Sequence, residues 1–127
     1  MRSAMRNPLG SSAIRLNAHC MRGRGRDSNA VTLTVQIEPD DLFLRENEGR
    51  SRAELEVTVG EKTVTGEVRF QQDVIRMNFT PQQLVVARRK GIPYTKQWTP
   101  GANTAVVRVL VRDKATDRVG TVDVRYD

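Results

Sequence analysis

The feature that most constrains this chain is an alternation of apolar and polar residues that recurs along most of its length. From Val31 to Ile37, apolar residues occupy every second position, and Thr or Gln fills the others. Successive side chains of a β-strand point to opposite faces, so this period of two predicts a strand with one buried face. The same reasoning predicts about seven strands, over residues 31–37, 53–59, 62–70, 75–79, 92–98, 105–111 and 119–126.

Turn residues between these segments indicate how the strands connect. Gly60-Glu61 is expected to form a tight turn, and residues 113–117 a hairpin loop. The segment 105–111 is apolar on both sides at three positions, which predicts a central strand. The core is expected to include Leu55, Val57, Ile75, Met77, Val107 and Val109.

One segment breaks the alternation. Residues 80–83 (Thr-Pro-Gln-Gln) have the form of a helix capping box with Pro at the first helical position. A basic run at 88–90 followed by Gly91 suits a helix C-terminus. These signals predict a helix of two to three turns. The alternative is a strand through residues 84–86, because β-branched residues favour strands.

Short strands and a single helix predict an all-β domain. The expected architecture is an antiparallel two-sheet sandwich, immunoglobulin- or fibronectin-like, with one short helix. A small open barrel is the alternative. The domain is expected to span residues 30–127. Residues 1–29 are rich in Gly, Ser, Asn and Arg, and are expected to form a disordered basic leader.

Positive charge is concentrated in that leader. Residues 1–29 hold six Arg against one Asp, whereas residues 30–127 carry a net charge of only +1. A nucleic-acid-binding domain needs its basic patch on the folded part, so nucleic acid is expected to bind only weakly and through the leader. No apolar run is long enough for a membrane helix. The leader also lacks the apolar stretch of a secretory signal.

Groups that could perform catalysis or hold a metal are scarce. The single histidine, His19, and the single cysteine, Cys20, are adjacent in the leader. A Cys–His pair is catalytic only when a fold holds it, so the chain is predicted not to be an enzyme and to use no cofactor or metal. Asp113 and Asp117 flank a hairpin loop and are interpreted as caps on turn amides; a calcium site is the alternative.

Two groups of side chains are possible partner contacts. Tyr94 and Trp98 could stack on a ligand, although such residues are more often core or interface anchors. Arg88, Arg89 and Lys90 form the one basic run of the domain, and could contact a phosphate or an acidic partner. The alternative for this run is a solvated helix end.

The second half of the chain resembles a known family. The matching blocks are residues 78–84, 90–94, 99–102 and 107–121. The last block is similar to the pattern R-V-x-V-R-D-x-A-T-G-R-x-G-S, with Asp117 in place of Gly and Thr121 in place of Ser. Together they resemble the C-terminal β domain of acidobacterial VWFA-related proteins, in which a von Willebrand factor A domain precedes this domain.

The resemblance implies a non-catalytic accessory or interaction domain, a C-terminal fragment of a larger exported protein. Its partner would be another protein or a neighbouring domain. The A domain's Asp-x-Ser-x-Ser metal motif is absent from this chain, so no metal ligands carry over. Family members are exported, although no signal is visible in residues 1–29. The alternative function is a small nucleic-acid-associated protein that uses the Arg/Gly-rich leader as an electrostatic tether.

Overall fold

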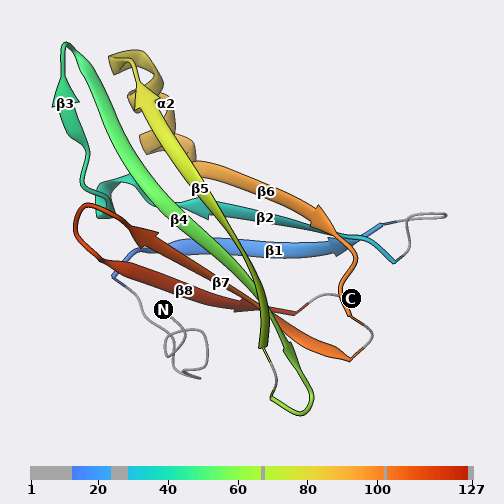
Figure 1. Ribbon diagram of the computed structural model, residues 1–127. Coiled ribbons are helices and arrows are strands. Elements are labelled where there is room, and N and C mark those ends of the chain that lie inside the picture. The colour runs from blue at the N-terminus through green and yellow to red at the C-terminus, as the bar shows by residue number, and fades with distance from the viewer. Residues whose placement is uncertain (1–12, 24–28, 67, 102, 126–127) are drawn as a thin grey trace.

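The computed structural model describes residues 13–23, 29–66, 68–101 and 103–125, and within them the chain is mostly β with one short α-helix (Figure 1). The elements are β1 (Leu16–Arg22), β2 (Val31–Ile37), the 3-10 helix η2 (Pro39–Asp41), β3 (Arg45–Asn47), β4 (Arg50–Thr63), β5 (Val68–Phe79), α2 (Pro81–Lys90), β6 (Ile92–Trp98), β7 (Thr104–Asp113) and β8 (Val119–Val124).

The strands form two antiparallel sheets. One sheet has the order β1-β2-β6. In the other, β4 is the central strand and pairs with β5 along one edge, and with β3 and β7 along the other edge. β8 extends this second sheet beyond β7. β7 thus lies between two strands, as its apolar residues on both faces predicted.

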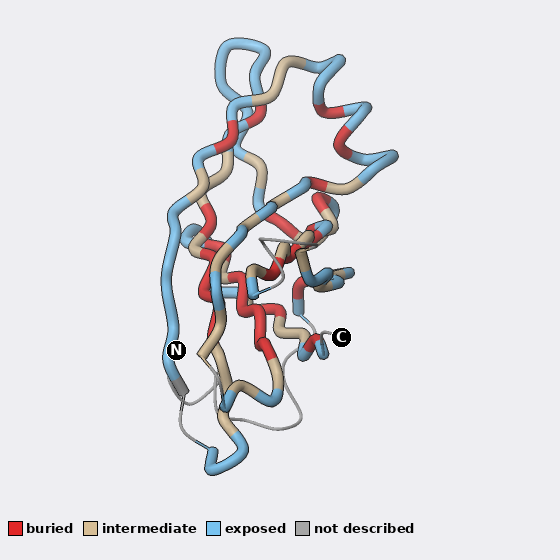
Figure 2. Tube along the Cα trace, turned by 90° about the vertical axis from the view of Figure 1, so that its right-hand side faces the viewer, coloured by how far each residue is buried: buried red, intermediate tan, exposed pale blue. Residues whose placement is uncertain are grey.

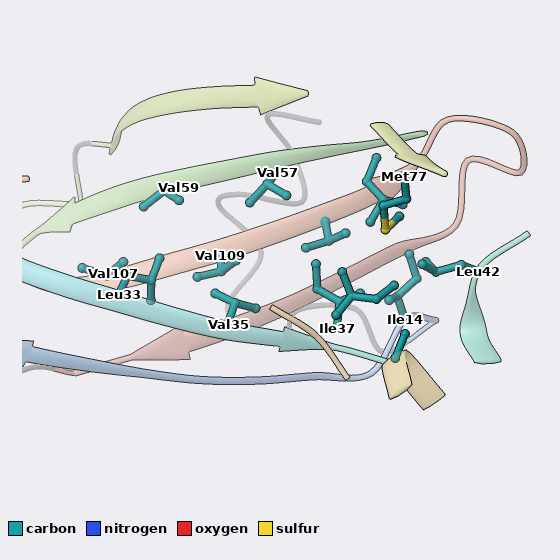
Figure 3. Close-up of a cluster of buried hydrophobic side chains, with 14 residues drawn as sticks. Ile14, Leu33, Val35, Ile37, Leu42, Val57, Val59, Met77, Val107 and Val109 are labelled. Carbon is teal, nitrogen blue, oxygen red and sulfur yellow. The ribbon is translucent and has the colours of Figure 1, made fainter. Parts of the chain in front are cut away.

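The hydrophobic core lies between the two sheets (Figure 3). Leu33, Val35 and Ile37 of β2 are fully buried and face the apolar side chains of β4 and β7. Figure 2 shows the buried positions mainly in the middle of the molecule, and exposed positions at the hairpin tips and along much of β5. The predicted core is confirmed: Leu55, Val57, Val107 and Val109 have no exposed surface, Met77 is buried, and Ile75 is partly buried.

The prediction of a disordered leader over residues 1–29 is wrong for the part that the structure describes. β1 pairs with β2 over seven residues, from Leu16 opposite Ile37 to Arg22 opposite Val31. Ile14 is 1% exposed and belongs to the core. β1 does alternate, with partly buried positions at Leu16, Ala18 and Cys20, but its inward side chains are mostly small. The remaining leader residues, 1–12 and 24–28, lie outside the described residues.

The predicted turn at Gly60-Glu61 is also wrong. β4 continues to Thr63, and a turn follows at residues 64–66, where Gly66 has a φ of +89° and donates its N–H to the Thr63 carbonyl at 3.0 Å. Glycine adopts this left-handed conformation without steric cost. Of the predicted segment 62–70, residues 62–63 therefore belong to β4 and residues 68–70 to β5, which continues through 75–79 with a polar stretch in its middle.

The predicted helix is confirmed as α2, and the strand alternative for residues 84–86 is wrong. The Thr80 hydroxyl accepts a hydrogen bond from the Gln83 N–H at 3.2 Å, and the Gln83 side chain accepts one from the Thr80 N–H at 2.9 Å. Gly91 ends the helix with a φ of +80°. Leu84 and Ala87 are buried, so local capping and one packed face together stabilise the helix.

Removing this cap gives a first testable prediction. We expect Thr80→Ala to lower the free energy of unfolding by about 1 kcal/mol, because the Gln83 N–H loses its acceptor at the helix start. Urea denaturation of the purified chain measures the change. Gln82→Ala, an exposed position in the same helical turn, is the matched control and should lower stability by much less. Equal effects of the two substitutions would contradict the capping role.

The two sheets approach each other along both of their sides. On one side, β8 lies next to β1, and a Cβ built on Gly120 would be 2.0 Å from the backbone oxygen of Ile14. On the other side, Asp73 of β5 accepts hydrogen bonds from Tyr94 and Lys96 of β6. These contacts hold the curled five-stranded sheet against the three-stranded one.

Candidate functional site

The aromatic residues that the sequence suggested as partner contacts lie on β6. Tyr94 and Trp98 share one face of this strand, are partly buried, and pack against the core. The Tyr94 hydroxyl donates to the Asp73 carboxylate, and Lys96 Nζ lies 3.3 Å from the same carboxylate. Burial and this carboxylate raise the pKa of Tyr94 above its usual value. Tyr94 is therefore largely engaged within the domain.

Trp98 has a more open setting at the far end of β6. It lines a hollow of about 400 Å³ with Phe70 and Lys96. Glu61 forms part of the wall, and its carboxylate accepts hydrogen bonds from the Gly101 N–H at 2.7 Å and from the Thr104 hydroxyl at 2.9 Å.

The basic run at the end of α2 lies elsewhere. Arg88, Arg89 and Lys90 line a hollow of about 300 Å³ together with Arg15. Arg88 lies 3.5 Å from Asp40, and Arg15 lies 2.9 Å from Asp41. α2 ends just before β6 begins, whereas Trp98 ends β6, roughly 20 Å away at the usual rise of a strand. The structure thus does not bring the five sequence-predicted contact residues into one site.

A larger cleft, which the sequence reasoning missed, lies where β3, β4, β5 and the β7–β8 turn meet. Its volume is about 740 Å³, within the usual range for ligand sites. Phe43, Ala53, Met77 and Ala115 provide apolar lining. The polar lining consists of Arg45, Asn47, Arg52, Glu54, Arg76, Asn78 and Lys114. We refer to this feature as the basic cleft, because it has four cationic side chains and one carboxylate.

The cations of the basic cleft fall into two classes. Arg76 and Lys114 share Glu54, at 2.9 Å and 3.3 Å respectively. Arg45 and Arg52 face each other directly across the β3–β4 pair. Among the described residues, no carboxylate lies within ion-pair distance of either Arg45 or Arg52. Like charges directly opposite each other on two strands are destabilising, so the facing Arg45 and Arg52 lower the stability of the β3–β4 pair.

A tight turn fixes that arrangement. Glu48 and Gly49 have φ angles of +54° and +77° and connect the paired residues Asn47 and Arg50. Positive φ at both central residues is typical of a type I′ turn, which sets the register of a two-residue hairpin. Residues 46–50 are all polar or Gly in the sequence, which gives no sign that Arg45 would lie opposite Arg52.

Asp113 positions the loop that carries Phe43. Its side chain is fully buried and accepts hydrogen bonds from the Phe43 N–H at 2.7 Å and from the Ala115 N–H at 3.0 Å. This confirms the interpretation of Asp113 as a cap on turn amides. Asp117 has a φ of +60°, a conformation that Asp tolerates and Gly prefers. With its backbone held by Asp113, the Phe43 side chain remains 50% exposed at the cleft.

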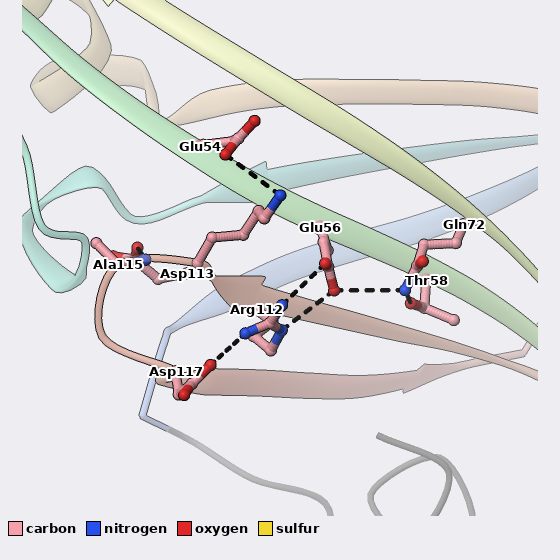
Figure 4. Close-up of polar contacts among 9 residues, drawn as sticks. Glu54, Glu56, Thr58, Gln72, Arg112, Asp113, Ala115 and Asp117 are labelled. Carbon is pink, nitrogen blue, oxygen red and sulfur yellow. Dashed lines mark hydrogen bonds and ion pairs between the residues drawn. The ribbon is translucent and has the colours of Figure 1, made fainter.

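Next to the cleft, the outer face of β4 and β7 carries a polar network (Figure 4). Arg112 donates to both oxygens of Glu56, at 3.1 Å and 2.8 Å, and also pairs with Asp117. Gln72 donates to the Thr58 hydroxyl at 3.2 Å. The hydrogen bonds from Arg112 are the main reason why the pKa of Glu56 lies below its usual value of 4.5.

This pair predicts a specific dependence of stability on pH. A carboxyl whose pKa is lowered by folding stabilises the folded state above its unfolded pKa, and this stabilisation disappears as the pH falls through the lower, folded pKa. We expect Glu56→Gln to lower the free energy of unfolding by about 1–2 kcal/mol at pH 7 relative to the wild type. The difference should shrink as the pH falls below 4.5 towards 3. Urea midpoints at several pH values measure it.

The exposed carboxylate Glu46 provides the control for this titration. Glu46→Gln should leave the midpoint close to that of the wild type at each pH. A loss in Glu56→Gln that stays constant down to pH 3 would show that its cause is packing and not the ionised pair.

His19 and Cys20 are the only imidazole and thiol of the chain, and both lie on β1. Adjacent residues of a strand point to opposite faces, and here His19 is exposed whereas Cys20 packs against the core. Burial raises the pKa of the Cys20 thiol to about 11. Two groups on opposite faces cannot act as a nucleophile and its base.

Two further observations concern the described residues. They contain no group of three or more His, Cys, Asp or Glu side chains that could hold a metal ion. Within the same part of the chain, no helix is long and apolar enough to span a membrane.

Comparisons with known proteins assign no family. No protein-family model and no curated protein matches the chain. One solved structure is similar, described as "X-ray structure of Northeast Structural Genomics Consortium target SoR45". It has 10% sequence identity and a TM-score of 0.40, over 92% of this chain and 84% of that one.

Proposed function

We propose that this chain is a non-catalytic protein-interaction domain that binds its partner in the basic cleft. The observation that carries the proposal is the facing pair Arg45 and Arg52 at the rim of a cleft that also exposes Phe43. Binding sites of this kind combine an apolar anchor point with a few convergent polar groups. Two guanidinium groups placed opposite each other lower the stability of the free chain. A bound partner would offset this loss of stability.

The proposal includes the wider setting that the family resemblance implies. The chain would be an accessory domain of a larger exported protein, and its partner another protein or a neighbouring domain. Its two antiparallel sheets, which face each other across one core, would form an immunoglobulin- or fibronectin-like sandwich.

The absence of catalysis also remains part of the proposal. The opposite directions of His19 and Cys20 on β1 support it. Two of the six arginines counted for the nucleic-acid tether belong to the folded part of the chain, because Arg15 binds Asp41 and Arg22 lies within β1. This weakens the alternative function of an electrostatic tether.

A selection of random twelve-residue peptides on the immobilised full chain tests the proposed function. We expect peptides that bind the wild-type chain to lose affinity for Phe43→Ser, which removes the exposed ring but keeps the Phe43 N–H that Asp113 binds. Trp98→Ser is the control, because Trp98 lies at the other end of the domain. Selected peptides that depend on Trp98 and not on Phe43, or no enrichment at all, would contradict binding at the basic cleft.

A further inference from the structure

We infer that the occupant of the basic cleft is an extended acidic peptide segment with one large apolar side chain. This inference rests on the proposed interaction function and adds the chemical class of the partner. Carboxylates of the segment would bind between Arg45 and Arg52, and its apolar side chain would pack on Phe43.

The charges of the cleft favour an anionic partner. The cleft has four cations and one carboxylate, whereas residues 30–127 as a whole carry only +1. The cleft therefore carries a local excess of positive charge. Glu54 already interacts with Arg76 and Lys114, which leaves Arg45 and Arg52 for a ligand. Guanidinium groups bind carboxylates through two parallel hydrogen bonds, and two facing guanidinium groups suit closely spaced carboxylates.

The apolar lining of the cleft favours a partner with an apolar side chain that becomes buried on binding. Phe43 is half exposed at the cleft, whereas Ala53 and Met77, which also line it, point to the core face of β4 and β5. A large apolar side chain placed against Phe43 would gain from burial, and an aromatic ring is a common anchor point at interfaces. Asn47 and Asn78 each offer a donor and an acceptor, which matches the two polar groups of a peptide bond.

The same features favour a peptide over nucleic acid. A duplex needs several cations arranged along a line of phosphates. Here the cations surround one cleft, and Glu54 lies among them. A single-stranded nucleic acid would need several stacking aromatic rings, whereas Phe43 is the one aromatic side chain that the described residues contribute to the lining of this cleft.

Fluorescence anisotropy with the full chain tests the inference. The probe is a labelled ten-residue peptide with two Glu on each side of a single Leu, flanked by Gly and Ser. Three matched probes replace all Glu by Gln, all Glu by Lys, or Leu by Ser. We expect the acidic peptide to bind, the Gln and Ser probes to bind at least about tenfold more weakly, and the Lys probe not to bind.

Two charge reversals locate the binding site. Arg52→Glu should weaken binding of the acidic probe at least about tenfold. Arg89→Glu makes the same change in net charge at an exposed position on α2, and should leave the affinity within about twofold. Equal losses in both variants, or a loss only in Arg89→Glu, would overturn the placement of the peptide in the basic cleft.

Two other occupants would overturn the inference. A labelled 20-base-pair duplex that binds at physiological salt and is lost with Arg52→Glu, while the acidic peptide does not bind, would identify nucleic acid as the ligand. Concentration-dependent dimerisation in sedimentation, abolished by Arg52→Glu, would identify a second copy. If the random selection yields Phe43-dependent peptides without acidic residues, the acidic class is wrong and the proposed function stands.

Discussion

A chain that starts at residue 30 will not reach the native fold. Its deletion removes β1, which pairs with β2 over seven residues, and Ile14, which is 1% exposed in the core. Loss of one fully buried Ile side chain costs about 2–5 kcal/mol, and the β1–β2 hydrogen bonds add further to the loss. Small domains are stable by only about 5–15 kcal/mol, so we expect loss of the cooperative thermal transition. Circular dichroism during heating measures it.

Point substitutions in the intact chain separate this effect from truncation itself. Ile14→Ala should lower the free energy of unfolding by about 2–5 kcal/mol. His19→Ala, on the exposed face of β1, should change it by less than about 0.5 kcal/mol. A chain of residues 30–127 that melts at the temperature of the full chain would contradict the place of β1 in the fold.

Gly120→Ala should lower the free energy of unfolding nearly as much as Ile14→Ala, although it adds only one methyl group. The new Cβ would lie 2.0 Å from the backbone oxygen of Ile14 and 2.9 Å from its carbonyl carbon. Backbone atoms cannot rotate away as a flexible side chain can, so β8 and β1 would have to separate. We expect a loss of about 3 kcal/mol, the upper part of the range for overpacked sites, measured by urea denaturation.

Gly101→Ala is the matched control for this substitution. A Cβ there would meet the Thr104 hydroxyl at 3.6 Å, which is an ordinary contact. Its effect should stay below about 1 kcal/mol. Equal effects of the two substitutions would show that β8 and β1 do not approach as closely as the structure places them.

The sequence predicted those features that depend on local patterns. The alternation in β2 and β7, the capping box of α2 and the turn role of Asp113 each depend on residues close together in the chain, and the structure has them all. β1 was missed because its inward residues Ala18 and Cys20 are small, so composition made the segment look polar. β5 was divided in two because Gln71, Gln72 and Asp73 interrupt its apolar alternation.

The basic cleft could not be predicted in the same way. Its charges come from β3, β4, β5 and the β7–β8 turn, which meet only once the strand registers are fixed. The register of β3 against β4 depends on left-handed conformations at Glu48 and Gly49, and Glu is not a typical residue for that position. A net charge of +1 over residues 30–127 also conceals a local excess of four cations over one carboxylate.

The facing pair Arg45 and Arg52 is proposed to bind an acidic partner, and Arg45→Thr tests this with two readouts. Removing one of two like charges should raise the free energy of unfolding by a few tenths to about 1 kcal/mol. The same substitution should weaken binding of the acidic peptide at least about tenfold.

The control is Arg69→Thr, because Arg69 lies opposite Glu61 on β4 and outside the basic cleft. It removes one member of an oppositely charged pair, so it should lower stability slightly and leave binding unchanged. The decisive measurement is the urea midpoint of Arg45→Thr beside its affinity for the acidic peptide. We predict a more stable chain that binds less well. A less stable chain that binds as tightly as the wild type would contradict the account.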